Sequence, residues 1–587
     1  MNTLFKTLVL SGIFGCLPAG SIVAQETVDF GKGVFIVNED WYGHQNSTVN
    51  FIEPDRTDGE NWHYRVIQAA NPGRELGCTN QFGAIYGGRF YLIAKQEKDP
   101  GAAITGGRIT VCDAATMKIL YQSELIDPSG ARCDGRGFLG VDEHKGYISS
   151  SNGIWVFNLD TYTVEKQVAG SANPNGTSGS TTDGGGSLYD GQCGTMARVG
   201  DRVFAVHQTY GLLVIDAAKD EVVETIAAAG VDTSLKRLCF GSVILGHDGN
   251  LWVSVGRGKQ GSNAPYLLKV DPYTLEQTVI TVPQGYYPPS NSWYAWTPDG
   301  LCTSYTEDAL YWNGGPNSWF SNSVVVKYDM ASGTFRNLVD LSAESAEDKD
   351  DGEWKLYGCS MRVHPVTDEL YMSLFHDFQS TVYKLSRRSS DGNVIQDYPM
   401  IENYWFPSLP VFPDVYRPEI HPIPAVNASA TDPTTVSLDG FATDADNLDA
   451  AIVMTVSSVS DDALLEASVR GRDLIIVPGA DAAGQNASVV ISVNSNGFVA
   501  EGTIDVHFGE TSLTDSSVTF TPSVCYSGGR LIAENMTPGD SIFIYDISGT
   551  CCGIFVADDM IFSVDPGLLP GVYVVRTGGS VSKILVR

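Results

Sequence analysis

Positively charged residues are scarce in this sequence. Its 587 residues include 37 Lys and Arg against 69 Asp and Glu, which gives a formal net charge of −32. Nucleic acids and anionic membrane surfaces are bound through basic patches. The deficit therefore argues against both kinds of partner, although acidity alone identifies no other partner.

Patterns for metal binding and for crossing a membrane are also missing. None of the eleven cysteines forms a CxxC pair, and the nine histidines never stand at ligand spacing within one predicted element. Both observations argue against a zinc site. After residue 24 there is no run of 18 or more apolar residues, so we expect no transmembrane segment.

Motifs that carry catalysis are absent as well. The sequence has no GxSxG, no HExxH, no Walker loop, and no GxGxxG between a predicted strand and a helix. Acidic residues are abundant but scattered, so no carboxylate pair of the glycosidase type can be chosen. We therefore expect a protein that is not an enzyme.

The first 24 residues have the pattern of a secretory signal peptide. Lys6 precedes the apolar run Leu8–Leu17, and the small residue Ala24 stands before Gln25. A weak lipoprotein box that ends at Cys16 offers an alternative, lipid-anchored form. In either case we expect an exported protein, free or tethered at a cell surface.

What the sequence does contain is a repeated β-meander. In the stretch 203–226, two runs of β-branched residues are separated by Tyr210-Gly211, and a third follows a short polar hairpin after Asp216. Comparable first strands begin 48 to 60 residues apart, near Val34, Phe90, Tyr147, Val203, Leu251, Leu310 and Leu370. One meander cannot bury both of its faces, so each needs neighbours.

The repeat predicts an all-β fold in which a seven-bladed β-propeller occupies residues 25–418. Propeller repeats are roughly 40–50 residues long, and the surplus here fits in loops such as Gly170–Gly186. Five second strands close on a similar turn that an Asp can cap. Closing the ring leaves only short, protected edges. An open array of β-sandwiches is the alternative.

Two smaller β-sandwich domains are predicted to follow. Proline-rich 404–424 indicates an exit linker, because proline cannot donate to a sheet ladder. The last propeller unit lacks an obvious fourth strand, and Val28–Phe30 could close the ring. Residues 419–510 read as an immunoglobulin- or cadherin-like sandwich. Asp444 and Asp446 there are candidate calcium ligands, although too few ligands are visible for a complete oxygen cage.

The cysteines allow two interpretations. Cys133, Cys193, Cys239, Cys302 and Cys359 each precede or begin the predicted innermost strand of a unit. They are either small buried residues near the propeller axis or partners in inter-blade disulfides of an exported protein. We favour the first interpretation.

A ligand-binding face is predicted from loops that share one register of the repeat. If the repeats superpose, the loops after the first strands converge on one end of the ring and form a shared concavity. Flat aromatics with a few polar groups suit a large, rigid ligand or a glycan. The candidate ligand-binding residues are Asn38, Glu39, Trp41, Tyr42, Gln96, Asn152, His207, Gln208, Tyr210, Trp312 and His376.

Two resemblances sharpen these expectations. Val34–Asp55 resembles the opening blade of YncE/YVTN-like surface propellers, with Asn38-Glu39 and Asn46-Ser47 matching and Asp40 standing where that family usually has Gly. Residues 511–587, with their Gly571-to-Arg576 strand, resemble the C-terminal sorting domain of type IX secretion, which implies delivery to the surface of a Gram-negative bacterium.

The first resemblance also implies a ligand. The BtuG-like branch of these propellers captures cobalamin for a TonB-dependent transporter, so this chain is expected to bind a corrinoid in the same way. A histidine such as His207 or His376 would then ligate cobalt or hydrogen-bond the corrin amides. The alternatives are a propeller that binds or cleaves glycans and a scaffold that binds another protein.

Overall fold

The computed structural model describes residues 28–176, 191–227, 240–255, 266–289, 300–314, 321–347, 353–509, 522–527, 529–577 and 580–586. The predicted signal peptide and Cys16 lie outside these ranges. The chain is all-β as predicted, with 3% helix and 52% strand. It divides into two compact units, with the boundary between Gly509 and Glu510.

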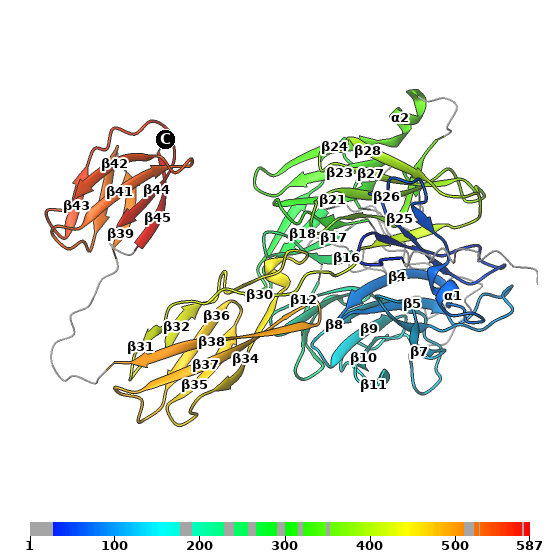
Figure 1. Ribbon diagram of the computed structural model, residues 1–587, viewed down its shortest axis with the longest axis horizontal. Helices are drawn as coiled ribbons and strands as arrows, with labels where there is room; N and C mark the ends of the chain where they lie inside the picture. The colour runs from blue at the N-terminus through cyan, green and yellow to red at the C-terminus, as the bar shows by residue number, and fades with distance from the viewer. Residues whose placement is uncertain are drawn as a thin grey trace, which may run out of the picture. The chain divides into compact units, whose positions relative to one another are not determined.

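Residues 34–411 form successive antiparallel sheets, most of them four-stranded (Figure 1). Two short helices, α1 (Val66–Ala70) and α2 (Leu341–Glu347), lie between strands. The strands in order across each sheet are β29 (Pro407–Val411), β1 (Val34–Asn38), β2 (Thr48–Ile52) and β3 (Trp62–His63); β4 (Cys78–Tyr86), β5 (Arg89–Gln96), β6 (Ile109–Asp113) and β7 (Ile119–Ser123); β8 (Gly135–Gly140), β9 (Lys145–Ser150), β10 (Ile154–Asn158) and β11 (Thr163–Gln167); β12 (Cys193–Val199), β13 (Arg202–His207), β14 (Gly211–Asp216) and β15 (Glu221–Ile226); β16 (Phe240–Leu245), β17 (Leu251–Val255), β18 (Tyr266–Val270) and β19 (Gln277–Thr281); β20 (Cys302–Thr303), β21 (Ala309–Gly314), β23 (Val324–Asp329) and β24 (Thr334–Asp340); and β22 (Ser321–Asn322), β25 (Lys355–Val363), β26 (Leu370–Phe375), β27 (Tyr383–Arg388) and β28 (Val394–Pro399).

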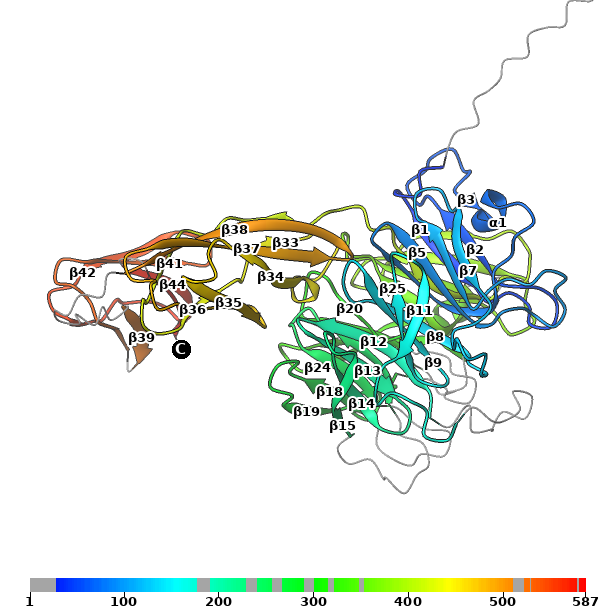
Figure 2. The ribbon, with the colours of Figure 1, turned by 90° about the horizontal axis from the view of Figure 1, so that it is seen from below.

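The innermost strands form a closed ring, which supports the predicted β-propeller. Each contacts the next, in the order β4, β8, β12, β16, β20, β25 and β29, and β29 also contacts β4. Figure 2 shows the neighbouring sheets β8–β11 and β12–β15 from a second direction. The predicted first strands of the repeat are therefore the second strands of their sheets. An innermost strand precedes each of them in the chain except β1, whose inner neighbour is β29.

Hydrophobic cores fill the spaces between adjacent sheets. In β1, Phe35 and Val37 pack towards the sheet of β5, in a cluster with Phe90. Their neighbours in the strand, Val34 and Ile36, pack towards the opposite side, in a cluster with Tyr371. Because both faces of such a strand are covered, all five residues of β1 are buried. This explains why these strands read as continuous apolar runs and not as alternating ones.

The ring is closed differently from our prediction. Val28–Phe30 forms no strand, although the Phe30 ring packs against those of Phe35 and Phe51, with centroids 5.8 and 5.0 Å away. The closing strand is β29, from the segment that we interpreted as linker, and it pairs with β1. The last sheet already has its own fourth strand, β28, paired with β27.

The buried cysteines agree with the first of the two interpretations. Cys133, Cys193, Cys302 and Cys359 are buried thiols, and no disulfide joins any pair of cysteines in the described part of the chain. Cys239 lies outside the described residues. These thiols fill space between tightly packed inner strands.

Two sets of sheets follow the ring. Residues 419–508 belong to the first unit and share one core, and residues 523–586 form the second unit with a core of its own. The first set comprises β30 (Glu419–Ile420) with β33 (Ala442–Thr443); β31 (Val426–Ala428), β38 (Phe498–Phe508), β37 (Asn486–Ser495) and β34 (Val453–Val459); and β32 (Thr434–Ser437), β36 (Asp473–Pro478) and β35 (Leu465–Arg470). The second comprises β39 (Ser523–Ser527), β40 (Arg530–Glu534) and β43 (Ile561–Val564); and β42 (Cys551–Val556), β41 (Ser541–Asp546), β44 (Gly571–Thr577) and β45 (Ser580–Val586).

Candidate ligand-binding site

Most of the predicted binding residues lie at one end of the ring, as the repeat requires. Asn38, Gln96 and His207 are the last residues of the second strands β1, β5 and β13. The innermost strands run antiparallel to the second strands, so each innermost strand begins at the end where its second strand finishes. The pairing of Cys193 with His207 shows this. We call this end the top face and the opposite end the bottom face.

The centre of the top face holds a buried cluster of polar and charged side chains. Gln81 Nε2 donates to Glu39 Oε1 at 2.5 Å and to the Tyr357 hydroxyl at 3.0 Å. These three residues come from three different sheets, and all are buried. A hydrogen-bonded network that crosses sheets in this way fixes their relative positions near the axis.

Two opposite charges in this cluster are held away from water. Glu39 and Lys95 are each 9% exposed. Burial raises the pKa of Glu39, an effect that the positive charge of Lys95 opposes. Burial likewise lowers the pKa of Lys95 to about 8, against the attraction of Glu39. Each group thus makes the charge of the other less unfavourable.

A second charged pair extends the cluster to two further sheets. Arg136 NH2 lies 3.9 Å from Asp134 Oδ2, and both side chains are almost fully buried. The Arg136 guanidinium also donates to Gln192 Oε1 through Nε at 3.0 Å. Gln208 Oε1 accepts from the backbone N–H groups of Gly191 and Gln192. Acidic, basic and amide groups from neighbouring sheets thus meet at the top face.

Exposed aromatic side chains flank this polar centre. Trp41 is 48% exposed and Tyr42 is 57% exposed. The Trp41 ring stacks on Tyr404 with centroids 5.1 Å apart, and the Tyr404 hydroxyl donates to the Phe378 carbonyl at 2.6 Å. Tyr210 is partly exposed and stacks on His207, with centroids 4.4 Å apart. These rings give the top face apolar area beside its charges.

Other candidates are engaged in structural contacts. Asn38 donates to the Thr48 hydroxyl at 3.1 Å, and Gln96 is half-buried opposite Cys78 in the β4–β5 ladder. Asn152 Oδ1 accepts from the Trp155 indole at 2.9 Å. Trp312 is fully buried, and its indole donates to the Tyr287 carbonyl at 2.7 Å. Asn152 and Trp312 therefore stabilise the loops through these contacts and do not form part of a surface for a ligand.

His207 is not arranged as a cobalt ligand, whereas the contacts of His376 leave its role open. His207 is fully buried, its Nδ1 accepts from the backbone N–H groups of Thr209 and Tyr210, and burial lowers its pKa to about 4. A neutral imidazole that accepts at Nδ1 carries its proton on Nε2, which leaves no free lone pair for a metal. His376 packs on Trp354 with centroids 4.0 Å apart, and its Nε2 is buried.

Sequence reasoning missed several members of the cluster, namely Gln81, Asp134, Arg136, Gln192 and Tyr357. We selected the loops after the second strands but not the residues that open the innermost strands. A signal was present, because Asp134 follows Cys133 and Gln192 precedes Cys193, cysteines that we had already placed at those strand starts. A charged residue beside a buried small residue at the axis indicates a buried polar centre.

The predicted calcium ligands lie in a crowded acidic junction after the ring. Asp446 Oδ2 accepts from the backbone N–H groups of Val415 and Tyr416, at 2.9 and 3.2 Å. Burial, together with the neighbouring Asp444, raises the pKa of Asp446 to about 6. Burial also raises the pKa of Asp414 to about 7. Within the described ranges, no three His, Cys, Asp or Glu side chains form a group suited to hold a metal ion.

Asp446→Asn is expected to stabilise the protein at pH 8 by roughly 1–2 kcal/mol, since one pKa unit corresponds to about 1.4 kcal/mol. A carboxyl whose pKa is raised by folding binds its proton more tightly in the folded state. The stability that the protonated carboxyl contributes is therefore present at acid pH and is lost as the pH rises from about 4 through 6. Asparagine keeps the acceptor for Val415 and Tyr416 but carries no charge.

The measurement is the thermal midpoint at pH 5 and pH 8, with the exposed Asp432→Asn as control. A lower thermal midpoint for Asp446→Asn than for the wild type at pH 8 would contradict the expected gain in stability. Adding calcium at pH 8 tests the predicted ligands Asp444 and Asp446. A rise in midpoint that Asp446→Asn abolishes would establish a calcium site.

The fold defines the chain as a protein of the β-propeller class. A family model, described as a domain of unknown function and designated DUF5074, matches residues 32–413. The match covers more than half of the chain, which therefore belongs to this family. No curated protein matches the sequence.

Several solved structures are weakly similar to the chain. A quinoprotein alcohol dehydrogenase-like protein from Bacteroides thetaiotaomicron is 15% identical, with a TM-score of 0.45, and the alignment covers 66% of this chain and 79% of that one. Apo AztD from Citrobacter koseri is 10% identical, with a TM-score of 0.32 and coverages of 91% and 97%. TolB from Acinetobacter baumannii is 13% identical, with a TM-score of 0.30 and coverages of 64% and 82%. In the described residues, no helix has the length and hydropathy needed to span a membrane.

Proposed function

We propose that this protein is an exported, non-catalytic receptor that binds a large polar ligand at the top face of a seven-bladed propeller. The observation that carries the proposal is the convergence of Glu39, Lys95 and Arg136, from three sheets, beside the exposed rings of Trp41 and Tyr42. Buried charges are costly to keep, so they mark positions where a protein needs polar recognition. The aromatic rings supply apolar contact area.

The ligand that we propose is a corrinoid. A corrin ring combines a broad flat surface with peripheral amides, which suits aromatic rings beside charged and amide side chains. His207 would position its loop and would not ligate cobalt, because its Nδ1 already accepts two hydrogen bonds. In this proposal residues 1–24 direct export, 419–510 and 511–587 form an immunoglobulin-like and a sorting-like sandwich, and a TonB-dependent transporter receives the ligand at the cell surface.

Calorimetric titration of the exported protein with cyanocobalamin and cobinamide tests this function. We expect saturable binding at nanomolar to micromolar dissociation constants. The double variant Trp41→Ala, Tyr42→Ala should bind at least about tenfold more weakly, because each buried aromatic contact contributes on the order of 1 kcal/mol or more. Tyr416→Ala, an exposed tyrosine outside the propeller sheets, is the matched control and should bind like the wild type.

Absence of both heat and spectral change would overturn the corrinoid proposal. A glycan panel and a pull-down from surface extracts then separate the remaining alternatives. Saturable glycan binding without turnover would keep the receptor function, whereas turnover that one carboxylate substitution abolishes would replace it with an enzyme. A stable protein partner without a small ligand would indicate a scaffold.

A further inference from the structure

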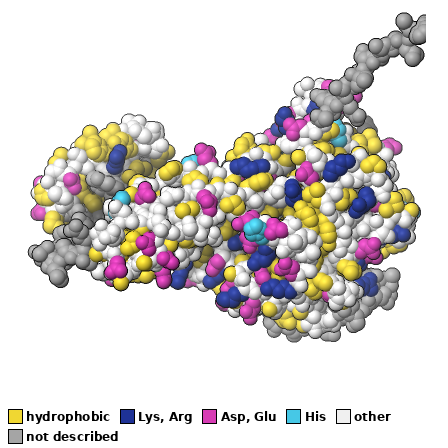
Figure 3. Space-filling view, turned by 60° about the horizontal axis from the view of Figure 1, so that its bottom comes forward, with side chains coloured by type: hydrophobic (Ala, Val, Ile, Leu, Met, Phe, Trp, Pro, Cys, Tyr) yellow, Lys and Arg dark blue, Asp and Glu magenta, His cyan; other side chains and the backbone are white. Residues whose placement is uncertain are grey.

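The second unit has a sheet with an apolar outer face. Its strands lie in the order β42, β41, β44 and β45, and the inner face packs into a core with Ile542, Ile544 and Val575. An antiparallel sheet with one face in water normally alternates hydrophobic residues inside with polar residues outside. Here the outer positions of both edge strands hold exposed hydrophobic side chains, namely Ile554 (61% exposed), Val556 (57%), Val581 (67%) and Leu585 (51%). Figure 3 shows hydrophobic side chains over much of this unit, the lobe at the upper left of the view.

The strand register joins these side chains into one patch. Residues that lie opposite one another in neighbouring strands have their side chains on the same face. The Phe543 and Tyr545 rings on β41 also stack, with centroids 6.4 Å apart, and so connect two rows of the face. The rows across the sheet are Ile554, Phe543, Arg576 and Val581, then Tyr545, Val574 and Lys583, and then Val572 and Leu585.

The charges on this face have one sign. Arg576 and Lys583 are exposed, and no Asp or Glu occupies an outer position of the four strands, all of which the structure describes. Neither cation makes an ion pair with a carboxylate of the described residues. In a chain with a formal net charge of −32, a cationic apolar face is an exception. Such a face complements a partner that is anionic and apolar.

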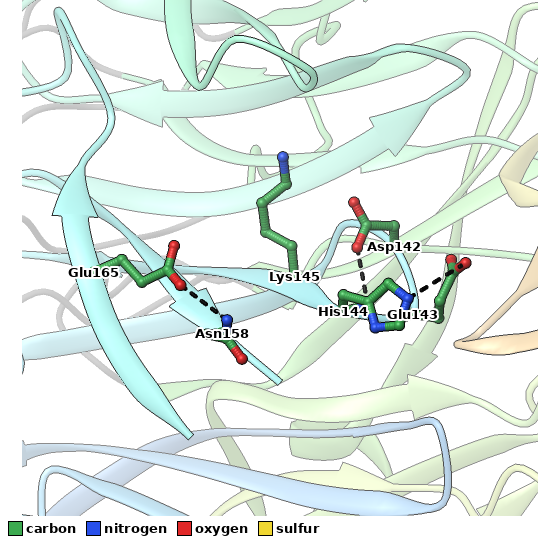
Figure 4. Close-up of a pocket in the computed structure, with 6 residues that line it drawn as sticks. All are labelled: Asp142, Glu143, His144, Lys145, Asn158 and Glu165. Atoms are coloured by element: carbon green, nitrogen blue, oxygen red, sulfur yellow. Dashed lines mark hydrogen bonds and ion pairs between the residues drawn. The ribbon is translucent and has the colours of Figure 1, made fainter. Parts of the chain in front are cut away.

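A charged hollow on the first unit shows the contrast (Figure 4). There His144 Nδ1 contacts Asp160 Oδ2 at 2.9 Å, and Lys145 Nζ pairs with Asp220 at 3.0 Å. These charges are compensated within the chain, so they call for no partner. The residues that line the hollow are Asp142, Glu143, His144, Lys145, Asn158 and Glu165.

We propose that the outer face of the sheet β42, β41, β44 and β45 docks on an anionic lipid bilayer. The aliphatic side chains of the edge strands enter the boundary between headgroups and acyl chains, and Arg576 and Lys583 bind the headgroup anions. The long stems of these two cations reach the headgroups from within an apolar patch. Surface charges act over only about 8 Å at physiological ionic strength. The acidity that argues against an anionic membrane for the whole chain therefore does not apply to this face.

A lipid surface fits this face better than a second copy of the chain does. Two copies joined through the same face would bring the cations Arg576 and Lys583 of both copies together, which costs energy. Protein interfaces are also centred on Trp, Tyr and Arg anchors that fill pockets. Residues 510–587 contain no tryptophan, and valine, isoleucine and leucine predominate on this face. The docking is independent of the proposed ligand, because every residue involved belongs to the second unit.

Flotation of the exported protein with lipid vesicles tests the proposal. We expect the protein to float with vesicles of equal parts phosphatidylcholine and phosphatidylglycerol at physiological salt, and to float much less with phosphatidylcholine alone. At about 1 M salt the screening length falls to about 3 Å, so binding to the anionic vesicles should weaken at least about tenfold. The salt series thus measures the contribution of the charges.

The double variant Val581→Ser, Leu585→Ser tests the apolar contribution. It removes exposed aliphatic area from β45, so binding to the anionic vesicles should weaken at least about tenfold. Both side chains point away from the core, and a circular dichroism spectrum like that of the wild type verifies the fold. Val223→Ser is the matched control, because Val223 is similarly exposed on β15 of the first unit, and it should bind like the wild type.

The double variant Arg576→Gln, Lys583→Gln tests the charges and leaves the apolar area in place. Binding to the anionic vesicles should again weaken at least about tenfold, whereas the weak binding to phosphatidylcholine should not change. Arg336→Gln, at an exposed ion pair of the first unit, is the control and should bind like the wild type.

Three results would each overturn the proposal: no flotation with the anionic vesicles, equal flotation with both lipid compositions, or wild-type binding by either folded double variant. Sedimentation of the protein without lipid tests the other occupant. A concentration-dependent dimer that Val581→Ser, Leu585→Ser dissociates would assign the face to a second copy and would also overturn the proposal.

Discussion

Shortening Leu409 to alanine is expected to lower the free energy of unfolding of the first unit by about 2–5 kcal/mol, the usual cost of truncating a buried leucine. Leu409 is 3% exposed and lies in the closing strand β29, in the core that also holds Phe35 and Val37. The strand is anchored further by Ser408, whose hydroxyl donates to the Asn80 carbonyl at 2.8 Å. Losing this packing weakens the contact between β29 and β1, which closes the ring.

Urea unfolding followed by tryptophan fluorescence measures this effect in the right part of the chain, because all ten tryptophans lie between Trp41 and Trp405. Leu120→Ala is the matched control. Leu120 is 44% exposed on β7, so the same chemical change should cost less than about 1 kcal/mol there. Equal midpoints for the two variants would show that β29 does not hold the ring closed.

The closing strand shows where sequence reasoning fails and why. Pro407 and Pro410 made this segment look like linker, because a proline inside a sheet removes a ladder hydrogen bond. In the structure β29 lies at the inner edge of its sheet and pairs only with β1, with Pro410 opposite Ile36. A strand with a single partner tolerates proline where its N–H would not be bonded. An edge position of this kind is not visible in a single sequence.

The fold was otherwise largely predictable, because each sheet is encoded locally. A stretch such as 203–226 carries its strands as runs of β-branched residues and its turns as Gly and Asp, all within one repeat. The turn aspartates behave as expected: Asp216 and Asp271 each accept from two backbone N–H groups of their turns. Interactions between residues so close in the sequence can be predicted without knowing the tertiary structure.

The candidate site was predictable only in outline. The repeat placed the loops on one face, but which side chains meet there depends on contacts between sheets. Gln81 reaches Tyr357 across 276 residues of sequence, and Arg136 reaches Gln192 across 56. Burial of Trp312 was invisible for the same reason, since the sheets that cover it come from different repeats. Exposure is decided by neighbours that one repeat does not contain.

Arg136→Met is expected to destabilise the first unit by about 3–5 kcal/mol, because removing one member of a buried ion pair leaves the other charge without that partner in a buried place. Asp134 is the charge left behind, with a side chain that is 2% exposed. Methionine keeps most of the volume of arginine, so the loss reports the charge and the hydrogen bonds to Gln192 more than a cavity. Arg336→Met, whose ion pair is exposed, should cost less than about 1 kcal/mol.

A double variant separates the charge from the packing. Adding Asp134→Asn to Arg136→Met removes the carboxylate that has lost the Arg136 guanidinium, so it should recover part of the lost stability in the same urea experiment, a coupling that a double-mutant cycle measures. Additive losses would mean that the two charges do not stabilise each other and that Arg136 acts only by filling space. Partial recovery would establish that the top face keeps its charged centre through mutual compensation. That charged centre is the feature on which the proposed recognition of a polar ligand depends.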